Sequence, residues 1–263
     1  MEWKDPPADL TDHVVICNCN EKTGRIVDEL HASPLAPIDV VLLIQDMSGW
    51  TGNPSWHPQS MSEGAVYTVI GCPTSEADLR KAHIPGARAA VILADPAHGG
   101  LADARSALVA MAIERETPRV HTVMELLSSV SRVHLQDSEV NEIICLGEIS
   151  EKLIAQSCIS PGVKHIFLDL LTIGRGTNQI FIAGLPEAAH GQTFRQLARQ
   201  AISAGAPFVI CGYIRGDAEG EGEPAFVINP RTGQEPGKDS ALGPADELVL
   251  LAQAPPDLDV LIC

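Results

Sequence analysis

The chain has few basic residues for its length. Its 263 residues include 18 lysines and arginines but 34 aspartates and glutamates, which gives a formal net charge of −16. Nucleic acids and anionic membrane surfaces attract basic patches, so this balance argues against either as the main partner, and no nucleic acid is expected to bind. Aromatic residues make up only 4% of the chain, whereas hydrophobic residues make up 45%. We therefore expect extensive cores built mainly from aliphatic side chains.

Long apolar runs are absent as well. No stretch reaches the roughly 18–20 apolar residues that a helix needs to cross a bilayer, and the N-terminus MEWKDPPADL lacks the apolar region of a signal peptide. The seven cysteines are an odd number, and the C-x-C spacing of Cys17 and Cys19 is not completed to a zinc site by a second pair or by histidines. The sequence predicts reduced, buried thiols in a cytosolic protein, and no metal site.

The stretch from Asp12 to Leu30 sets the organisation of the chain. His13 to Cys17 is a short β-branched run typical of a buried parallel strand. A polar turn follows, and apolar residues then recur at helical spacing up to Leu30. A strand, a tight turn and a helix at the start of an alternating chain are how a dinucleotide-binding fold begins.

The glycine fingerprint of that fold is missing. Asn18, Asn20 and Thr23 stand where the glycines of G-x-G-x-x-G would be, and Gly24 comes one place late. Asparagine tolerates left-handed backbone, so the turn can still form. Side chains at these places obstruct the close approach that a pyrophosphate needs. The pattern therefore favours the fold and disfavours the usual cofactor.

Further apolar runs alternate with helical patterns and predict a doubly wound parallel sheet. The six expected strands are His13–Cys17, Ile38–Ile44, Val66–Ile70, Ala89–Leu93, Val120–Met124 and Glu142–Cys145. Between the second and third strands, residues 47–64 predict a long loop in place of the usual helix. We also expect a loop at Pro96–Gly100, a helix at Leu126–Val133, and a helix at Asp103–Arg115. The apolar stripe predicted for that last helix consists of Ala104, Leu108, Met111 and Ala112.

Two apolar helical stretches follow the sheet. Ile149–Cys158 and Val163–Leu171 have no obvious surface of their own domain left to cover, which favours burial against a second subunit. From Thr177 onward strands outnumber helices, so a small α+β domain is expected. The acidic loop GDAEGEGE lacks the order of a calcium-binding loop and predicts a hairpin tip.

Several segments resemble one known family. They are HVVICNCNEKTGRIVDEL, GCPTSEADLRKAHIPGARAAVILAD, LADARSALVAMAIERETPRVHTVMEL and NEIICLGEISEKLIAQSCISPG. In this order and spacing they are similar to an RCK (regulator of K⁺ conductance) domain of the TrkA-N/TrkA-C type, and the second segment is the most specific. The resemblance implies a Rossmann-like N-terminal domain over residues 12–146, a helical crossover and dimerisation segment over 147–175, and a TrkA-C-like C-terminal subdomain over 176–256.

The chain departs from this family at two kinds of ligand site. The calcium-gated archaeal members place a carboxylate just before the sixth strand, where this chain has Asn141, and two more after the crossover, where it has TIGRGTN. That calcium site is therefore expected to be absent. The nucleotide-binding members keep the glycine fingerprint that this chain lacks. The resemblance thus implies a role more clearly than it implies a ligand.

A ligand of the N-terminal domain would lie outside the carboxyl ends of the strands, where the strand order reverses. The side chains expected to face it are Asn18, Asn20, Glu21, Lys22, Asp46 and Asp95. Lys22 could meet a phosphate and Asp46 a ribose of an adenine nucleotide or NAD, the candidate cofactors, although the cofactor is unknown. The alternative is that the side chains at the missing glycine positions fill the cleft and leave a structural remnant.

The resemblance implies a cytosolic gating-ring subunit of a potassium channel, which couples ligand binding to pore opening. Its expected partners are further copies of itself, as a homodimer within a larger ring, and a channel pore, and the chain is expected to be cytoplasmic, at the inner face of the cell membrane when attached to that pore. A freestanding TrkA-type regulator of a transporter membrane subunit is the alternative, followed by an NAD-dependent oxidoreductase. No general acid or base stands in a recognisable motif, so no catalytic residue and no enzyme are expected.

Overall fold

The computed structural model describes residues 4–33, 37–45, 65–135, 138, 140–174, 176–216 and 224–262. The chain divides into two compact units, Met1–Lys164 and His165–Cys263, which are described separately below. Helix α5, Val163–Leu171, begins at the junction between them. The narrower boundaries expected from the sequence, 12–146, 147–175 and 176–256, remain predictions.

The first unit is built on a parallel sheet whose strands follow the order β3-β2-β1-β4-β5-β6. The strands are β1 Val14–Cys17, β2 Val40–Ile44, β3 Val66–Ile70, β4 Ala89–Ile92, β5 His121–Leu126 and β6 Glu142–Cys145. β1 and β2 are buried at every position, as their continuous apolar sequences predict. The strand order reverses between β1 and β4, and the predicted doubly wound sheet is confirmed.

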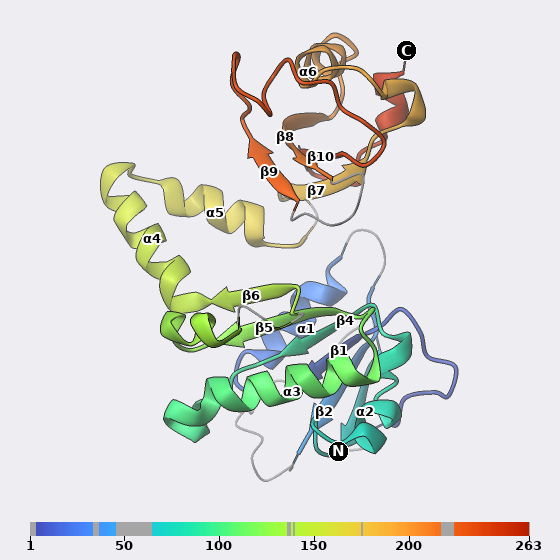
Figure 1. Ribbon diagram of the computed structural model, residues 1–263, viewed down its shortest axis with the longest axis vertical. Helices are drawn as coiled ribbons and strands as arrows, with labels where there is room; N and C mark the ends of the chain where they lie inside the picture. The colour runs from blue at the N-terminus through green and yellow to red at the C-terminus, as the bar shows by residue number, and fades with distance from the viewer. Residues whose placement is uncertain are drawn as a thin grey trace. The chain divides into compact units, whose positions relative to one another are not determined.

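Helices cover the two faces of this sheet differently (Figure 1). Helix α1, Thr23–His31, packs through Val27 on the face that carries Ile16 and Leu42. Helices α2, Glu76–Lys81, and α3, Ala102–Glu116, pack on the opposite face, which carries Val15 and Leu43. The remaining elements are the 3₁₀ turns η3 Ile84–Gly86, η4 Pro96–Leu101 and η5 Ser129–Leu135, and helix α4 Leu146–Ile159. The right-handedness of the strand connections explains this placement. The connection from β1 to β2 runs toward one edge of the sheet and the connection from β4 to β5 runs toward the other, so their helices lie on opposite faces.

Three local expectations were wrong. Leu108 and Met111, assigned to the apolar stripe of α3, are 57% and 55% exposed, whereas Val109, Ala110 and Ile113 are buried. This helix carries apolar side chains on both faces, so periodicity alone could not choose the buried face. The segment expected to be a helix at Leu126–Val133 starts with the last residue of β5 and belongs to the 3₁₀ turn η5 only from Ser129 onward. The loop expected at Pro96–Gly100 forms η4. The loop predicted at residues 47–64 lies outside the described residues.

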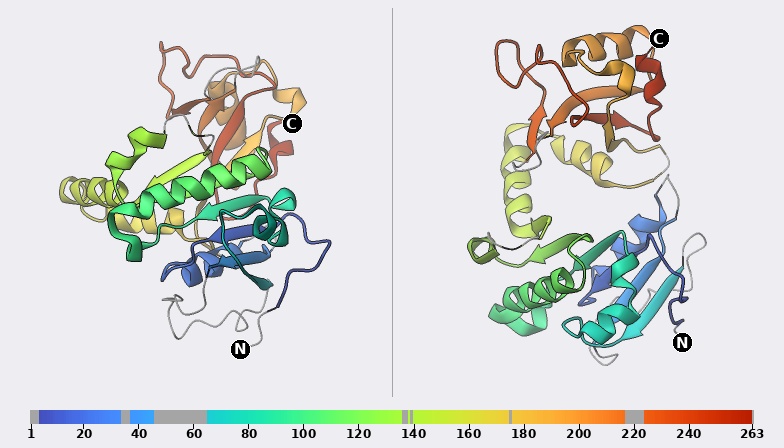
Figure 2. Two further views of the ribbon diagram at one scale, coloured as in Figure 1. Left: turned by 60° about the horizontal axis from the view of Figure 1, so that its bottom comes forward. Right: turned by 45° about the vertical axis from the view of Figure 1, so that its right-hand side comes forward.

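The second unit has an antiparallel sheet in the order β7-β10-β8-β9. Its strands are β7 Gln179–Gly184, β8 Phe208–Arg215, β9 Ala225–Ile228 and β10 Glu247–Ala252. Helix α6, Phe194–Ser203, lies over one face (Figure 2, right) and buries Phe194 and Leu197 there. Two short 3₁₀ turns, η6 Glu187–Ala189 and η7 Leu258–Leu261, complete the unit. The predicted smaller α+β subdomain is therefore confirmed.

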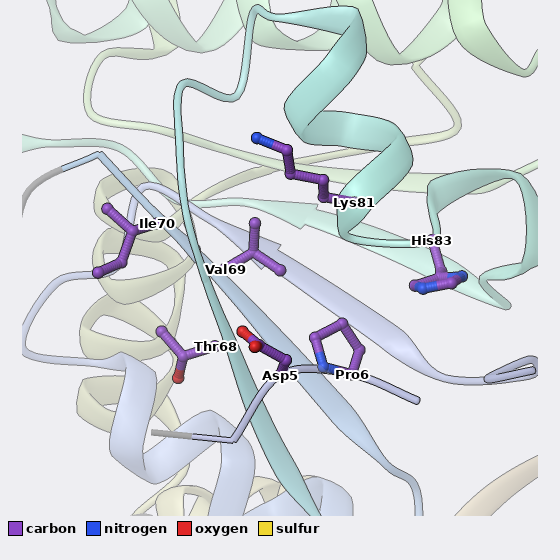
Figure 3. A pocket seen from close by; sticks show the side chains of 7 residues that line it. All are labelled: Asp5, Pro6, Thr68, Val69, Ile70, Lys81 and His83. Carbon is purple, nitrogen blue, oxygen red and sulfur yellow. The ribbon is translucent and has the colours of Figure 1, made fainter. Parts of the chain in front are cut away.

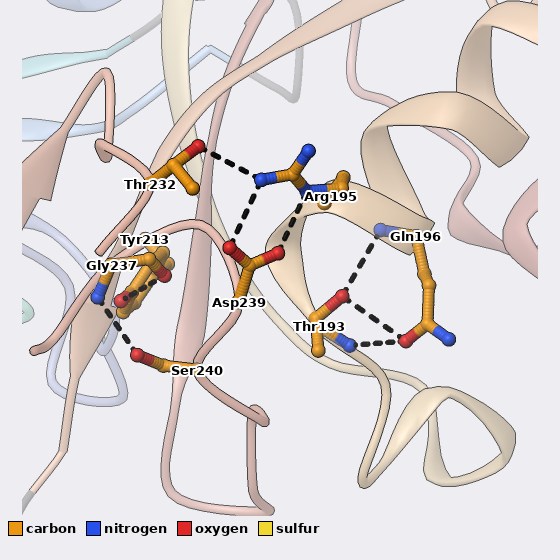
Figure 4. A network of polar contacts seen from close by, with 8 residues as sticks. All are labelled: Thr193, Arg195, Gln196, Tyr213, Thr232, Gly237, Asp239 and Ser240. Atoms are coloured by element: carbon orange, nitrogen blue, oxygen red, sulfur yellow. Dashed lines mark hydrogen bonds and ion pairs between the residues drawn. The ribbon is translucent and has the colours of Figure 1, made fainter. Parts of the chain in front are cut away.

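A polar network fastens the long β9–β10 connection to this unit (Figure 4). Arg195 of α6 donates to both carboxylate oxygens of Asp239, at 2.7 and 2.9 Å, and to the Thr232 hydroxyl at 2.8 Å. The Tyr213 hydroxyl of β8 donates to the Gly237 carbonyl at 3.0 Å. Thr193 caps α6 in a reciprocal pair with Gln196.

Candidate functional site

The turn between β1 and α1 is held by asparagine side chains in place of glycines. Asn18 adopts the left-handed backbone with φ of 57°, which the residue tolerates better than most. Asn20 is only 2% exposed; its amide nitrogen donates to the Ala94 carbonyl at 2.8 Å, and its amide oxygen accepts from the Lys22 backbone N–H at 2.9 Å. The Asn20 N–H donates to the Thr23 hydroxyl at 2.9 Å. Both ends of the Asn20 side-chain amide are therefore already hydrogen-bonded within the protein, and little of the side chain is left to bind a ligand.

Lys22 pairs with a carboxylate that the sequence reasoning missed. Its ammonium forms an ion pair with Oε1 of Glu125, at the end of β5, and Oε2 of Glu125 accepts from the Ala94 backbone N–H at 3.2 Å. Glu125 is 6% exposed. A charged residue inside the apolar run VHTVMELL was the available signal, because buried carboxylates are nearly always paired. The cation expected to meet a phosphate is thus already neutralised.

The other predicted side chains do not converge on one cleft. Asp95 Oδ2 lies 2.7 Å from Nδ1 of His98. Asn18 borders a cavity of 160 Å³ together with Gln45 and Arg105, whose guanidinium donates to the Gln45 side-chain oxygen at 3.2 Å. Glu21 and Lys22 border a different hollow, described next. Asp46 lies outside the described residues.

The larger hollow has a volume of 590 Å³ and lies between the start of α1 and the strands β4, β5 and β6. Its walls are mainly aliphatic: Ile26, Val91, Leu93, Val123, Ile144 and Leu146. Four charged residues, Glu21, Lys22, Arg25 and Glu125, complete the lining. An apolar concavity with a few polar groups is the usual form of a small-molecule site.

A tight turn after β3 explains the most specific segment of the sequence. Asp78 of α2 accepts from the Cys72 backbone N–H at 3.0 Å, and its carboxylate lies directly against Gly71. The Cys72 sulfur lies 3.0 Å from the Thr74 hydroxyl and accepts from the Gln45 side chain at 3.3 Å. The hydrogen bond with Thr74 lowers the pKa of the Cys72 thiol.

Asn141 has a structural role at the position where the calcium-gated relatives were expected to carry a carboxylate. Its side-chain oxygen accepts from the Thr122 N–H at 2.7 Å and from the Thr122 hydroxyl at 3.1 Å. These bonds connect the start of β6 to β5. Within the described ranges, no group of three or more His, Cys, Asp and Glu side chains is placed to hold a metal ion. No described helix is both long enough and apolar enough to cross a membrane.

The segment that precedes β1 is attached to the edge of the sheet. The Thr68 N–H of β3 donates to the Lys4 carbonyl at 2.9 Å, and Asp12 forms a bidentate ion pair with Arg88 at 2.8 and 2.5 Å. A cavity of 520 Å³ lies beside this segment (Figure 3). Asp5 and Pro6 border it from the segment, and Lys81 and His83 border it from the end of α2 and the turn that follows.

Comparison with known proteins agrees with this architecture. Residues 9–124 match the family profile of the calcium-activated potassium channel slowpoke-like RCK domain. The chain is 28% identical over 167 residues to the calcium-gated potassium channel TvoK of Thermoplasma volcanium, a match that covers 62% of this chain and 44% of TvoK. It is 26% identical over 226 residues to the probable ion channel SYM8 of Pisum sativum, covering 83% of this chain and 24% of SYM8.

The structure of the human SLO3 gating ring has the same fold. It superposes on 93% of this chain, using 44% of the SLO3 chain, with a TM-score of 0.64 and 17% sequence identity. The present chain therefore spans less than half the length of each of these relatives.

Proposed function

We propose, from the premise that this chain carries an RCK domain homologous to the gating-ring domains of potassium channels, that it is the cytosolic regulatory part of such a channel. In this role it couples the binding of a ligand to the opening of a pore. The match over residues 9–124 carries the proposal, and the fold of both units supports it. Such coupling needs a ligand that binds two conformations with different affinity, and it needs no catalysis.

Exposed apolar helices support assembly into a ring. Ile154 of α4 is 66% exposed in the single chain, and Ile166, Leu168 and Leu171 of α5 are 61%, 56% and 68% exposed. Several exposed apolar side chains on one short helix, as on α5, mark a protein interface more often than scattered ones do. We propose that these helices pair with a second copy of the chain around a two-fold axis, as part of a larger ring.

The N-terminal segment offers a route for mechanical coupling. It is bonded to the edge strand β3 through Lys4, and to the residue before β4 through the Asp12–Arg88 pair. We propose that the chain lies at the inner face of the cell membrane and is connected to a pore through this segment, so that movement of the first unit is transmitted along it.

The proposal is tested by replacing the matching region of TvoK with this chain. The chimera is reconstituted in liposomes, and K⁺ flux is followed while adenine nucleotides, NAD and divalent cations are added separately. If the chain regulates the pore, the chimera should assemble, and its K⁺ flux should change when at least one of the ligands is added. The flux should also change when a protease removes the grafted chain. Flux that is identical before and after proteolysis, and independent of every ligand, would contradict the proposal.

A further inference from the structure

The 590 Å³ hollow exists because of the order in which the strands are connected. The crossover from β1 to β2 puts α1 on one face of the sheet, and the crossover from β4 to β5 puts α3 on the other. The α1 face of β5 and β6 is therefore left without a connecting helix of the first unit. On that face Val123 is half-buried and Ile144 is 37% exposed, whereas Met124, on the α3 face, is fully buried.

The charges around the hollow are one buried ion pair and two exposed residues on the rim. Lys22 is neutralised by the buried Glu125 at the inner end, so this pair contributes no net charge. Arg25, one position along the rim on α1, is exposed, and among the described residues no carboxylate lies within ion-pair distance of it. Glu21 is exposed to solvent on the same rim. An amphipathic molecule inside the hollow would therefore meet the Arg25 guanidinium at its mouth, with the Glu21 carboxylate on the same rim.

We propose that this hollow binds a small amphipathic carboxylate, with its apolar part against β4, β5 and β6 and its carboxylate at Arg25. The inference rests on the proposed ligand-sensing function and names the ligand class of that domain. The volume lies within the range of small-molecule sites, about 300–1,000 Å³. Six aliphatic side chains provide the favourable burial, and the guanidinium provides a charge-assisted contact.

The same observations disfavour an adenine nucleotide at this position. A nucleotide brings a ribose, a base and at least two negative charges, which need several free polar partners. The polar side chains nearest the α1 turn are already bonded within the protein: Asn20 to Ala94, and Lys22 to Glu125. A ligand with one charge and an apolar remainder matches what the hollow leaves unpaired.

Calorimetry on the full chain tests the proposal with sodium octanoate as the probe. Octylammonium chloride has the same chain with the opposite charge, and 1-octanol has the same chain without a charge. We expect saturable binding of octanoate, weaker binding of octanol, and no saturable binding of octylammonium. Arg25→Ala should weaken octanoate about threefold to tenfold, as loss of a partly exposed charge contact does. It should leave octanol unchanged.

Two controls separate this site from general apolar adhesion. Arg119→Ala removes an exposed arginine away from the hollow and should leave octanoate binding as in the wild type. Ile144→Gln should weaken both octanoate and octanol, whereas Ile70→Gln, on the opposite edge strand and 59% exposed, should weaken neither. Folding of every variant is verified by its thermal transition.

Three results would overturn the inference. The first is equal affinity for octanoate and octylammonium, and the second is an octanoate affinity that neither Arg25→Ala nor Ile144→Gln changes. The third is no saturable octanoate binding by the wild type. The last result would mean that another part of the protein fills the hollow. None of these results affects the TvoK chimera experiment, whose flux would still respond to another ligand. Conversely, if the chain binds octanoate but does not regulate flux in the chimera, the proposed binding site stands and the proposed function is contradicted.

Discussion

Gly71 and Asp78 lie in direct contact at the turn after β3. The Asp78 carboxylate lies against the glycine because it accepts a hydrogen bond from the N–H of the next residue, Cys72, at 3.0 Å. A Cβ atom at Gly71 would lie 2.6 Å from Cγ of Asp78 and 2.7 Å from its Cβ. Neither distance is sterically possible without movement. The glycine is therefore required by the hydrogen bond that fixes α2 to the end of β3.

Gly71→Ala should consequently destabilise the first unit by about 1–3 kcal/mol, the typical cost of forcing an extra methyl group into a packed site. The measurement is the urea-induced unfolding transition followed by circular dichroism. Gly147→Ala is the matched control, since its nearest neighbouring atom would be 4.0 Å away and alanine is favoured within α4. Equal stability of the two variants would show that the contact with Asp78 is unimportant.

Lys22→Met should destabilise the first unit because it leaves the buried Glu125 without its cation. We expect a loss of about 1–3 kcal/mol, less than for a fully buried pair because the Lys22 side chain is 33% exposed. The double variant Lys22→Met/Glu125→Gln should recover part of the loss, since a neutral amide costs less to bury. Lys152→Met, in an exposed pair with Glu148, is the control and should change stability little.

Stability should fall as the pH is lowered through the histidine range. Burial lowers the pKa of His13, whose ring is fully buried and whose Nε2 lies 3.1 Å from the Ala82 carbonyl, and burial also lowers the pKa of His31. The unfolded chain therefore binds protons at a higher pH, near the ordinary value of 6.5, than the folded chain does. The stabilising contribution is complete above that value and is lost below it.

The measurement is the urea midpoint at about pH 7.5 and about pH 5, which bracket this range. His13→Leu should reduce the difference between the two midpoints, and the double variant His13→Leu/His31→Leu should reduce it further. A difference that the double variant leaves unchanged would show that carboxylates, and not these histidines, govern the pH dependence.

The assembly proposed for α4 and α5 predicts a mass above that of one chain in light scattering at micromolar concentration. Ile154→Glu and Leu168→Glu should lower that mass, because each places a charge in an apolar interface. Ile202→Glu on α6 is the control; Ile202 is 82% exposed and lies outside the two helices. A wild-type chain that scatters as a monomer would contradict the interface.

In the second unit, Gly237→Ala should destabilise strongly, since its Cβ would lie 2.2 Å from the Gln234 carbonyl and 2.6 Å from that of Arg231. The turn at Gly237 also accepts the hydrogen bond from Tyr213. We expect a loss of about 2 kcal/mol or more from the combined clash and the broken hydrogen bond. Gly243→Ala, with no atom within 4 Å of its Cβ, should be nearly neutral. The measurement for both variants is the urea-induced unfolding transition.

Much of the fold could be read from the sequence because its signals are local. Runs such as Val40–Ile44 are continuous and apolar, which is typical of a buried parallel strand. The site was predicted less completely. Asn20 and Lys22 were recognised from the turn pattern, but their partners are far away in the chain, with Glu125 separated from Lys22 by 103 residues. No local pattern reports such a pairing.

The sequence by itself determined the alternation of strands and helices, the missing glycine fingerprint and the change of pattern after Thr177, since each depends on neighbouring residues. Only the tertiary structure decided which face of α3 is buried, that Glu125 neutralises Lys22, and that Asn18 and Lys22 border different cavities. These outcomes depend on the order and handedness of the strand connections, which bring distant side chains together and leave one face of β5 and β6 without a helix.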